Sequence, residues 1–472
     1  MSEAMERSTH HDTAPEDKIS ILHKATYAIG ALVNQTQAAA ISAMVLVLNL
    51  GLGMNPVLVG LVGTIPRLLD AFTDPLIGYT TDNTRTRYGR RRPFIFFGAI
   101  FSGILFALLF QLNKANSESY NFWYFLIVQC FFVVAFAFYS IPWIALGFEM
   151  TPDYHERTRL QGTGNVIAQF AWLMSPWLFK LMYTNKDLVH GVRDLAVLFG
   201  VFIAVGGILP AIFNKEYFTN LPKPQKKHVM KDFFNGCAIT LKNRPFLKLC
   251  AVTFLVFNGF MLASAFSAYV IFFYDYAGDY GKGGTLLGWF GTVTALANFC
   301  VISLITWVST KIGKRNTFLI AIPISIVGYA LKWVGYNPQH PYLLLIAAPF
   351  IAFGLGSVFT IVSSMLADVC DLDELDTGKR REGTFGAIYW WMIKLGQALA
   401  SLASGILLNA TGFNVALGAN QTTHALLYMR LCDIGIPIVT SIMAIFIIMT
   451  FDITEDKAYA IRKQLEERRG KA

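Results

Sequence analysis

The sequence predicts an all-α membrane protein in which twelve transmembrane helices form two parallel six-helix bundles. Three observations support this fold class. The 472-residue chain is 54% hydrophobic and only 15% charged, whereas soluble domains are usually about 25% charged. Apolar runs of about 20 residues or more recur along the chain, separated by short polar breaks. A basic motif also returns 224 residues after its first occurrence.

Each apolar run can cross a hydrocarbon core of roughly 30 Å as one helix. The expected spans are about 22–50, 57–80, 93–112, 122–149, 161–183, 195–213, 246–274, 285–309, 317–336, 342–367, 384–410 and 424–451. The longest spans imply tilt or bends, and prolines inside helices are common bend points. We expect such bends at Pro66, Pro75, Pro142 and Pro176.

The distribution of Lys and Arg predicts the orientation. Five alternate connections hold twenty-one of these residues, and the connections between them hold four. Because Lys and Arg stay preferentially on the cytoplasmic side, both termini are expected to be cytoplasmic. The protein itself is expected in the plasma (inner) membrane. Anionic lipid at that surface accounts for the net charge of +9 without nucleic acid.

The same spans divide the chain into five parts. We expect a disordered cytoplasmic tail over 1–20, a six-helix bundle over 21–213, a linker over 214–245, a second bundle over 246–451 and a cytoplasmic tail over 452–472. The first twenty residues lack the apolar run of a cleaved signal peptide. The basic linker suits an interfacial helix or a solvated connection, and the sequence leaves both readings open.

A repeat links the two halves. "RYGRRRPF" around Gly89 returns as "KIGKRNTF" around Gly313, and "DYHERTRLQGT" returns loosely as "DTGKRREGT". The first motif follows the second and the eighth span, and the other motif precedes the fifth and the eleventh. Equal positions in both halves predict parallel six-helix repeats.

Three ionisable residues interrupt the second span. Asp70 and Asp74 lie four residues apart and share a helix face, with Arg67 one turn before. The repeat offset places neutral Thr294 and Asn298 at the matching positions, so the fold itself does not require the acids. A carboxylate in the bilayer is costly unless it is paired, hydrated or protonated. It can hold a proton or ligate Na⁺; the alternative is a structural network of Arg67 with Asp70, or Lys394 with Asp74.

Three segments carry a family resemblance: "DAFTDPLIGYTTDNTRTRYGRRRPF", "IPWIALGFEMTPDYHERTRLQG" and "ADVCDLDELDTGKRREGTFGAIYWWMIKLG". They resemble the glycoside-pentoside-hexuronide:cation symporters, the family of melibiose permeases within the major facilitator superfamily. The likeness runs from about Ile21 to Phe451. It implies sugar transport by alternating access, with substrate held between the bundles. It also implies a cation site at Asp70, Asp74 and Thr73, and a coupling lysine at Lys394.

Several positions depart from the family pattern. Ser140 stands where the family has a third acid, Ala137 where it has a threonine, and Phe359 where it has a tryptophan. Neutral amides replace charged sugar ligands. With few oxygens left for Na⁺, we favour H⁺. The expected substrate-binding residues are Asn34, Gln35, Tyr139, Ser140, Trp143, Asn165, Phe359, Trp390, Trp391 and Lys394, because amides bind hydroxyls and aromatic faces stack on sugars.

The remaining charged residues suggest other roles. By the resemblance, Arg85, Arg90, Asp153, Asp368, Asp371 and Arg381 form a cytoplasmic gate that latches the outward-facing state. Arg430 and Asp433 are expected to pair locally, and Lys332 to snorkel toward an interface. Arg67 and Lys394 are expected to balance the acids.

No catalytic constellation, metal cluster or phosphate-binding loop is present in the sequence, so we predict a non-enzyme without a cofactor. We expect a monomer whose ligands are a small molecule, a transported cation and the lipid bilayer. Two alternatives on the same fold stay open: a carrier of lysolipids or other amphiphiles, and a sugar facilitator that needs no cation.

Overall fold

The computed structural model describes residues 15–151, 153–183, 187–216, 240–378 and 381–468. Within these ranges the chain is helical and forms no strand. Eleven helical segments of the described chain are long and apolar enough to cross a membrane. A twelfth long helix, α6, has 29 residues but carries Glu156, Arg157 and Arg159 in its first turns. The predicted all-α membrane fold is confirmed.

The first bundle contains α1 (Ile21–Met44), α2 (Leu46–Leu50), α3 (Pro56–Asn83), α4 (Arg92–Leu109), α5 (Glu118–Glu149), α6 (Tyr154–Met182) and α7 (Leu188–Phe213). Polar caps define where the helices begin. The side chains of Asn55, Ser117 and Asp187 accept hydrogen bonds from the first free N–H groups of α3, α5 and α7. Each cap stands just before an apolar run, so local chemistry and hydropathy agree.

The second bundle follows after the connection. It contains α9 (Arg244–Val270) with the π-helical turn η2 (Ile271–Asp275), α10 (Tyr280–Ile312) and α11 (Lys314–Gly335). A tenth span follows, built from η3 (Pro341–Ile346), α12 (Ala347–Ser357), η4 (Val358–Val362) and α13 (Ser363–Thr377), and then α14 (Glu382–Ala410) and α15 (Thr423–Met449). The short helix α16 (Glu455–Arg468) comes after the bundle. The π-helical turn η4 interrupts the tenth span near its middle. Such turns often mark functional positions in helices.

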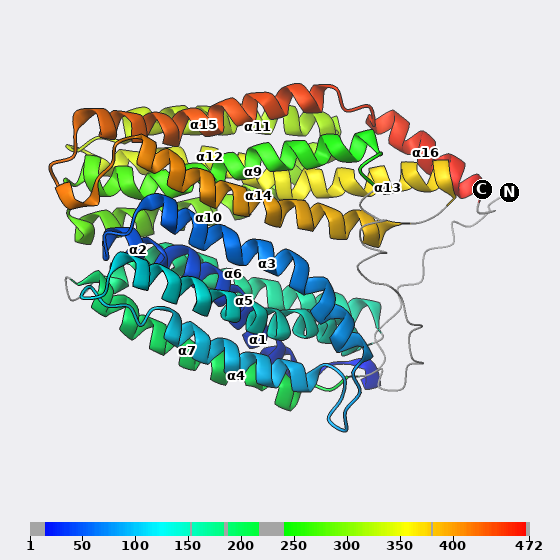
Figure 1. Ribbon diagram of the computed structural model, residues 1–472. Coiled ribbons are helices and arrows are strands. Elements are labelled where there is room, and N and C mark those ends of the chain that lie inside the picture. The colour runs from blue at the N-terminus through cyan, green and yellow to red at the C-terminus, as the bar shows by residue number, and fades with distance from the viewer. Residues whose placement is uncertain (1–14, 152, 184–186, 217–239, 379–380, 469–472) are drawn as a thin grey trace.

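The bundles approach each other through two helix pairs, α3 with α14 and α6 with α10. Thr64 donates a hydrogen bond to the carbonyl of Ala398 at 2.8 Å, and Trp177 donates to Thr292 at 2.9 Å. We call the side that holds Asp17 and Arg468 the termini side, and the opposite side the distal side. Both bonds lie in the distal halves of their helices, and the ribbons of the bundles diverge toward the termini side (Figure 1).

The repeated basic motif has the same backbone role in both bundles. Gly89 and Gly313 both have positive φ, +108° and +79°, a conformation that favours glycine. The carboxylate of Glu216 accepts the N–H of Arg90 at 2.9 Å and that of Arg91 at 2.6 Å. A Cβ atom on Gly89 would lie 2.8 Å from Glu216, and one on Gly313 would lie 2.8 Å from Glu455. Each motif thus meets a glutamate that follows the last helix of its bundle.

The segments outside the bundles are only partly described. Residues 217–239, which hold most of the expected interfacial helix, lie outside the described residues, as do residues 1–14 of the expected N-terminal tail. At the C-terminal side α16 packs on α13, with Ile461 and Leu465 buried. The sequence predicted only a cytoplasmic tail over this segment and no helix.

Candidate functional site

A lysine and two aspartates connect the bundles. Lys394 of α14 places its Nζ atom 2.9 Å from Oδ2 of Asp70 and also in contact with Oδ2 of Asp74, both on α3. Asp70 is only 7% exposed, while the side chains of Lys394 and Asp74 are about one-third exposed at 30% and 29%. The site therefore lies at the contact between two moving units of the predicted mechanism, partly shielded from solvent.

Helix geometry explains this arrangement. A spacing of four residues places Asp70 and Asp74 one above the other on the α3 face that meets α14. Buried carboxylates need a partner because desolvation disfavours their charge. One ammonium between two carboxylates leaves a net charge of −1. The group can therefore take up one more positive charge and become neutral.

Two other predicted members of this group lie apart from it. Arg67 is half-buried and forms no hydrogen bond or ion pair with any residue that the structure describes. Thr73 donates its hydroxyl to the backbone carbonyl of Asp70 at 3.4 Å. The structure thus pairs both acids with Lys394. The alternative pairing of Arg67 with Asp70 is wrong.

Polar groups on α1 face a different environment. The side chain of Asn34 is 8% exposed, and its Oδ1 atom has no hydrogen-bond partner among the described residues. Gln35 accepts a hydrogen bond from the indole N–H of Trp172 on α6 at 3.0 Å. Gln37 is fully buried, and neither of its amide atoms is paired within the described chain. Sequence reasoning missed Gln37, although its place in the run Asn-Gln-Thr-Gln was a signal.

Two aromatic residues expected at the substrate site pack inside the first bundle. Tyr139 is fully buried and donates its hydroxyl to the carbonyl of Gly30 at 3.0 Å. Trp143 is 7% exposed and stacks on Tyr27 with 4.9 Å between ring centroids. Both rings fill space between α1 and α5, and their contact with substrate stays a prediction.

The other expected substrate residues retain exposed surface to differing degrees. Asn165 is exposed on α6, and Ser140 is half-buried on α5. Trp390 is 56% exposed, whereas its neighbour Trp391 is half-buried, which follows from the 100° turn between adjacent helical residues. Phe359 lies in η4, is 39% exposed and contacts Phe257 edge to face.

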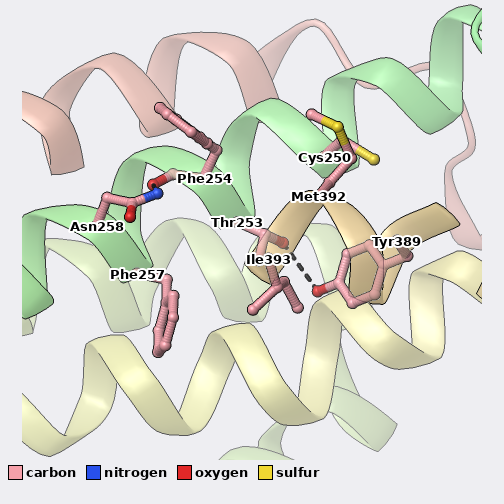
Figure 2. A pocket seen from close by; sticks show the side chains of 8 residues that line it. All are labelled: Cys250, Thr253, Phe254, Phe257, Asn258, Tyr389, Met392 and Ile393. Carbon is pink, nitrogen blue, oxygen red and sulfur yellow. Dashed lines mark hydrogen bonds between the residues drawn. The ribbon is translucent and has the colours of Figure 1, made fainter. Parts of the chain in front are cut away.

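A small pocket lies between α9 and α14, close to Lys394 in the chain (Figure 2). Thr253 of α9 and Tyr389 of α14 are joined across it by a hydroxyl to hydroxyl hydrogen bond of 2.9 Å. The pocket is lined by Cys250, Thr253, Phe254, Phe257, Asn258, Tyr389, Met392 and Ile393. Sequence reasoning did not single out any of these eight residues.

The expected gate residues lie on the termini side, and three of them, Arg90, Asp368 and Arg381, form ion pairs within their own bundle. Arg90 bonds Glu149 at 2.6 Å, and Arg381 bonds Asp373 at 2.9 Å. The Asp368 carboxylate accepts a hydrogen bond from Lys314 at 2.7 Å. Asp153 caps α6, Asp371 is half-buried on α13, and Arg85 lies in the loop after α3. The acceptors Glu149 and Asp373 and the donor Lys314 were not predicted.

A second ionic group is buried within the second bundle. Lys332 of α11 donates to Asp433 of α15 at 2.6 Å and to Ser267 of α9 at 2.8 Å. Tyr336 donates to the other oxygen of Asp433 at 2.6 Å. The expected pairing of Arg430 with Asp433 is wrong, as is the snorkelling of Lys332, because Asp433 turns into the bundle. Arg430 instead lies over the rings of Tyr274 and Trp333.

Comparisons with known proteins extend these observations. A glucuronide carrier protein homolog of Escherichia coli is 25% identical over 425 residues, which cover 88% of this chain and 89% of that protein. The sodium-dependent lysophosphatidylcholine symporter 1-B of Danio rerio is 23% identical and covers 97% of this chain and 92% of its own.

A solved structure shares the fold. A bacterial homolog of the human lysosomal transporter Spinster, in an inward-facing and unoccupied conformation, superposes with a TM-score of 0.64 at 15% identity, covering 94% of this chain and 97% of that one.

Residues 26–455 match the family described as MFS/sugar transport protein. The resemblance noted in the sequence is confirmed. This chain therefore belongs to the MFS/sugar transport protein family, a family of membrane transporters and not of enzymes.

Proposed function

We propose that this protein is a secondary active transporter that couples the uptake of a sugar or glycoside to a cation, H⁺ in preference to Na⁺, by alternating access. The observation that carries the proposal is the bridge of Lys394 to Asp70 and Asp74. An ion pair across two bundles must weaken or rearrange when the bundles rock. A cation that binds the carboxylates changes the strength of that pair, which is the requirement for coupling.

The coupling step follows from charge balance. In the arrangement described, one ammonium neutralises one of the two carboxylates, Asp70 or Asp74, and the other charge is uncompensated. A proton added to one of them neutralises the group and leaves Lys394 with a single anionic partner. The ion pairing between α3 and α14 is then weaker, and the loaded transporter can change conformation. Release of the proton restores the contact of Lys394 with two carboxylates and returns the carrier to its unloaded state.

The surroundings of the acids favour a proton. Na⁺ needs several oxygen ligands at once, and the space between the carboxylates already holds the Lys394 ammonium. Across from α3, Ala137 has no oxygen in its side chain and is buried, and Thr73 directs its hydroxyl to its own backbone. A proton needs one carboxylate oxygen only.

The substrate assignment is based on neutral polar groups. Asn34, Gln35 and Asn165 offer amides, Ser140 a hydroxyl, and Trp390 and Phe359 exposed aromatic surface. Amides pair with hydroxyl groups in both directions, and rings stack on the apolar face of a sugar. We infer that these residues face substrate between the bundles in the inner membrane, with both termini cytoplasmic. The distal contacts then describe a carrier open toward the cytoplasm, whose gate residues join across the bundles in the outward-facing state.

Transport into proteoliposomes tests the proposal. The probes are [¹⁴C]methyl β-glucuronide and [¹⁴C]methyl β-xyloside, each offered with an imposed H⁺ or Na⁺ gradient. We expect uphill accumulation of one glycoside with the H⁺ gradient and its collapse with a protonophore. Stimulation by Na⁺ at fixed pH would replace H⁺ with Na⁺. Uptake of radiolabelled lysophosphatidylcholine without uptake of either glycoside would favour the amphiphile carrier.

A further inference from the structure

Two buried asparagines occupy equivalent positions in the two repeats. Asn34 lies on α1, the first helix of the first bundle, and Asn258 lies on α9, the first helix of the second. They are 224 residues apart, which is the offset between Gly89 and Gly313. Asn34 is 8% exposed and Asn258 is 7% exposed. The Oδ1 atom of each has no hydrogen-bond partner among the described residues.

At Asn258 the orientation of the amide is fixed. Its Nδ2 group donates to the carbonyl of Phe254 one turn earlier on α9, at 2.7 Å. This bond uses the amide as a donor and leaves Oδ1 as an acceptor. A buried acceptor without a donor is unusual in native proteins, because desolvation costs free energy that a hydrogen bond would return. The missing donor is expected to come from a molecule that enters the site.

The pocket beside Asn258 has room for such a donor. About 10 Å³ is open to the centre of a water molecule, which is enough for one water or one hydroxyl group. Figure 2 places Asn258 beside Phe254 on α9, with the ring of Phe257 below and the Thr253 to Tyr389 hydrogen bond at the other end of the pocket. One polar acceptor between aromatic rings is the pattern of a carbohydrate contact.

An unpaired acceptor alone is not sufficient evidence for a site. Asn49 is 1% exposed, its Nδ2 group donates to the carbonyl of Met54 at 2.6 Å, and its Oδ1 atom is also unpaired in the described chain. Asn49 lines neither of the two pockets described, and 224 residues later stands Phe273. The pocket and the repeated position distinguish Asn258 from Asn49, and Asn49 therefore serves as the matched control.

The site also lies next to the helix that carries the coupling lysine. A Cβ atom on Gly396 would come within 2.6 Å of Nδ2 of Asn258, so α14 passes close to this amide. Gly396 stands two residues after Lys394. A substrate group held at Asn258 would therefore contact the segment of α14 that positions Lys394 against Asp70 and Asp74.

We propose that Asn258 is a substrate-binding residue of the second bundle, the counterpart of Asn34, and that its Oδ1 atom accepts a hydrogen bond from one hydroxyl group of the transported glycoside. This inference rests on the proposed function, since it names a residue of the same site. It assigns one hydroxyl contact to each bundle. The two bundles would then hold the substrate from opposite sides throughout the transport cycle.

The test compares Asn258→Ala with Asn49→Ala and the wild type. The probe is whichever of the two methyl glycosides the wild type transports, together with its 2-, 3- and 4-deoxy analogues. We expect the wild type to take up one deoxy analogue with a KM raised about three- to tenfold, which is the effect of one lost neutral hydrogen bond. Asn258→Ala should raise the KM of the parent glycoside by the same factor and no longer distinguish that analogue. Asn49→Ala should behave as the wild type.

Two measurements keep the outcomes separate. Size-exclusion profiles and thermal unfolding report whether each variant is folded, and Asn258→Leu, which removes the acceptor but keeps a side chain of similar size, replaces Asn258→Ala if that variant is not. The inference is wrong if the Asn258 variant has a KM within twofold of wild type and distinguishes every deoxy analogue as the wild type does. The proposed function would then still stand. Absence of glycoside uptake by the wild type would overturn both.

Discussion

The two bundles place their intramembrane charges differently. In the first bundle, the described ion pairs between its own residues all lie near the helix ends, as with Lys24 and Glu156 or Lys114 and Asp187. Its intramembrane acids, Asp70 and Asp74, pair instead with Lys394 of the other bundle. The second bundle buries a complete pair, Lys332 with Asp433, inside itself.

The repeat makes this difference informative. At the positions that match Asp70 and Asp74, the second bundle has Thr294, which bonds its own helix at Phe290, and Asn298. A six-helix unit can therefore be built without acids on that helix. In the proposed mechanism, a pair inside one bundle moves with that bundle and stays intact during rocking, whereas a pair between bundles changes with every cycle. The first kind suits stability, and the second suits coupling.

The largest expected effect comes from removing the charges between the bundles. In Asp74→Asn, substrate exchange should continue, but uphill accumulation should fall to the equilibrium level. Lys394 and Asp70 then form a neutral pair, as in the protonated state, so the group no longer takes up and releases a proton during the cycle. Asp70→Asn should weaken coupling at least in part. Counterflow and gradient-driven uptake measured on the same vesicles separate the two activities. Uphill accumulation by the double Asn variant would return both acids to a structural role.

Breaking the pair inside the second bundle should affect stability and not coupling. Asp433→Leu leaves the ammonium of Lys332 buried without its counter-ion, which typically costs about 3–5 kcal/mol. The double variant Asp433→Leu/Lys332→Met should recover most of that loss, since apolar replacements of buried pairs are often neutral. Thermal unfolding in detergent measures both. A loss of ion dependence in the stable double variant would contradict the contrast between the bundles.

The glycines of the repeated motif should behave alike in the two bundles. Gly89→Ala and Gly313→Ala each force a side chain into a positive φ conformation, which costs about 1–3 kcal/mol, and each new Cβ meets a glutamate at 2.8 Å. We expect similar drops in the midpoint of thermal unfolding. A fall in only one bundle would show that the repeat is structural in one half alone. The double variants with Glu216→Gln or Glu455→Gln identify how much of each drop comes from the carboxylate.

The smallest expected effect concerns an exposed pair on the distal side. The hydrogen bond from the Lys114 ammonium, at 2.9 Å, and those from the N–H groups of Val189 and His190 hold the pKa of Asp187 below its ordinary value. A depressed pKa in the folded state means that the stabilisation exists above the unfolded pKa and is lost as the pH falls through the folded one. Lys114→Met should lower stability at neutral pH by at most about 1 kcal/mol. The unfolding midpoints of the wild type and of Lys114→Met should therefore differ at neutral pH and become equal at acid pH.

Sequence alone determined the features that depend on local order. Hydropathy runs fixed the spans, because each backbone group in a membrane must be paired within its own helix. The repeat predicted two bundles, and a spacing of four residues placed Asp70 and Asp74 on one face. These inferences need only the period of a helix and the polarity of each residue.

Packing between helices determines which helix faces meet. It paired the acids with Lys394, more than three hundred residues away in the chain, and not with Arg67 one turn before. It turned Asp433 toward Lys332 and not toward Arg430, packed Tyr139 and Trp143 into the first bundle, and formed the pocket beside Asn258. A helix presents each residue at a known angle, but the rotation and depth of one helix against another result from packing over the whole bundle, which no local pattern records.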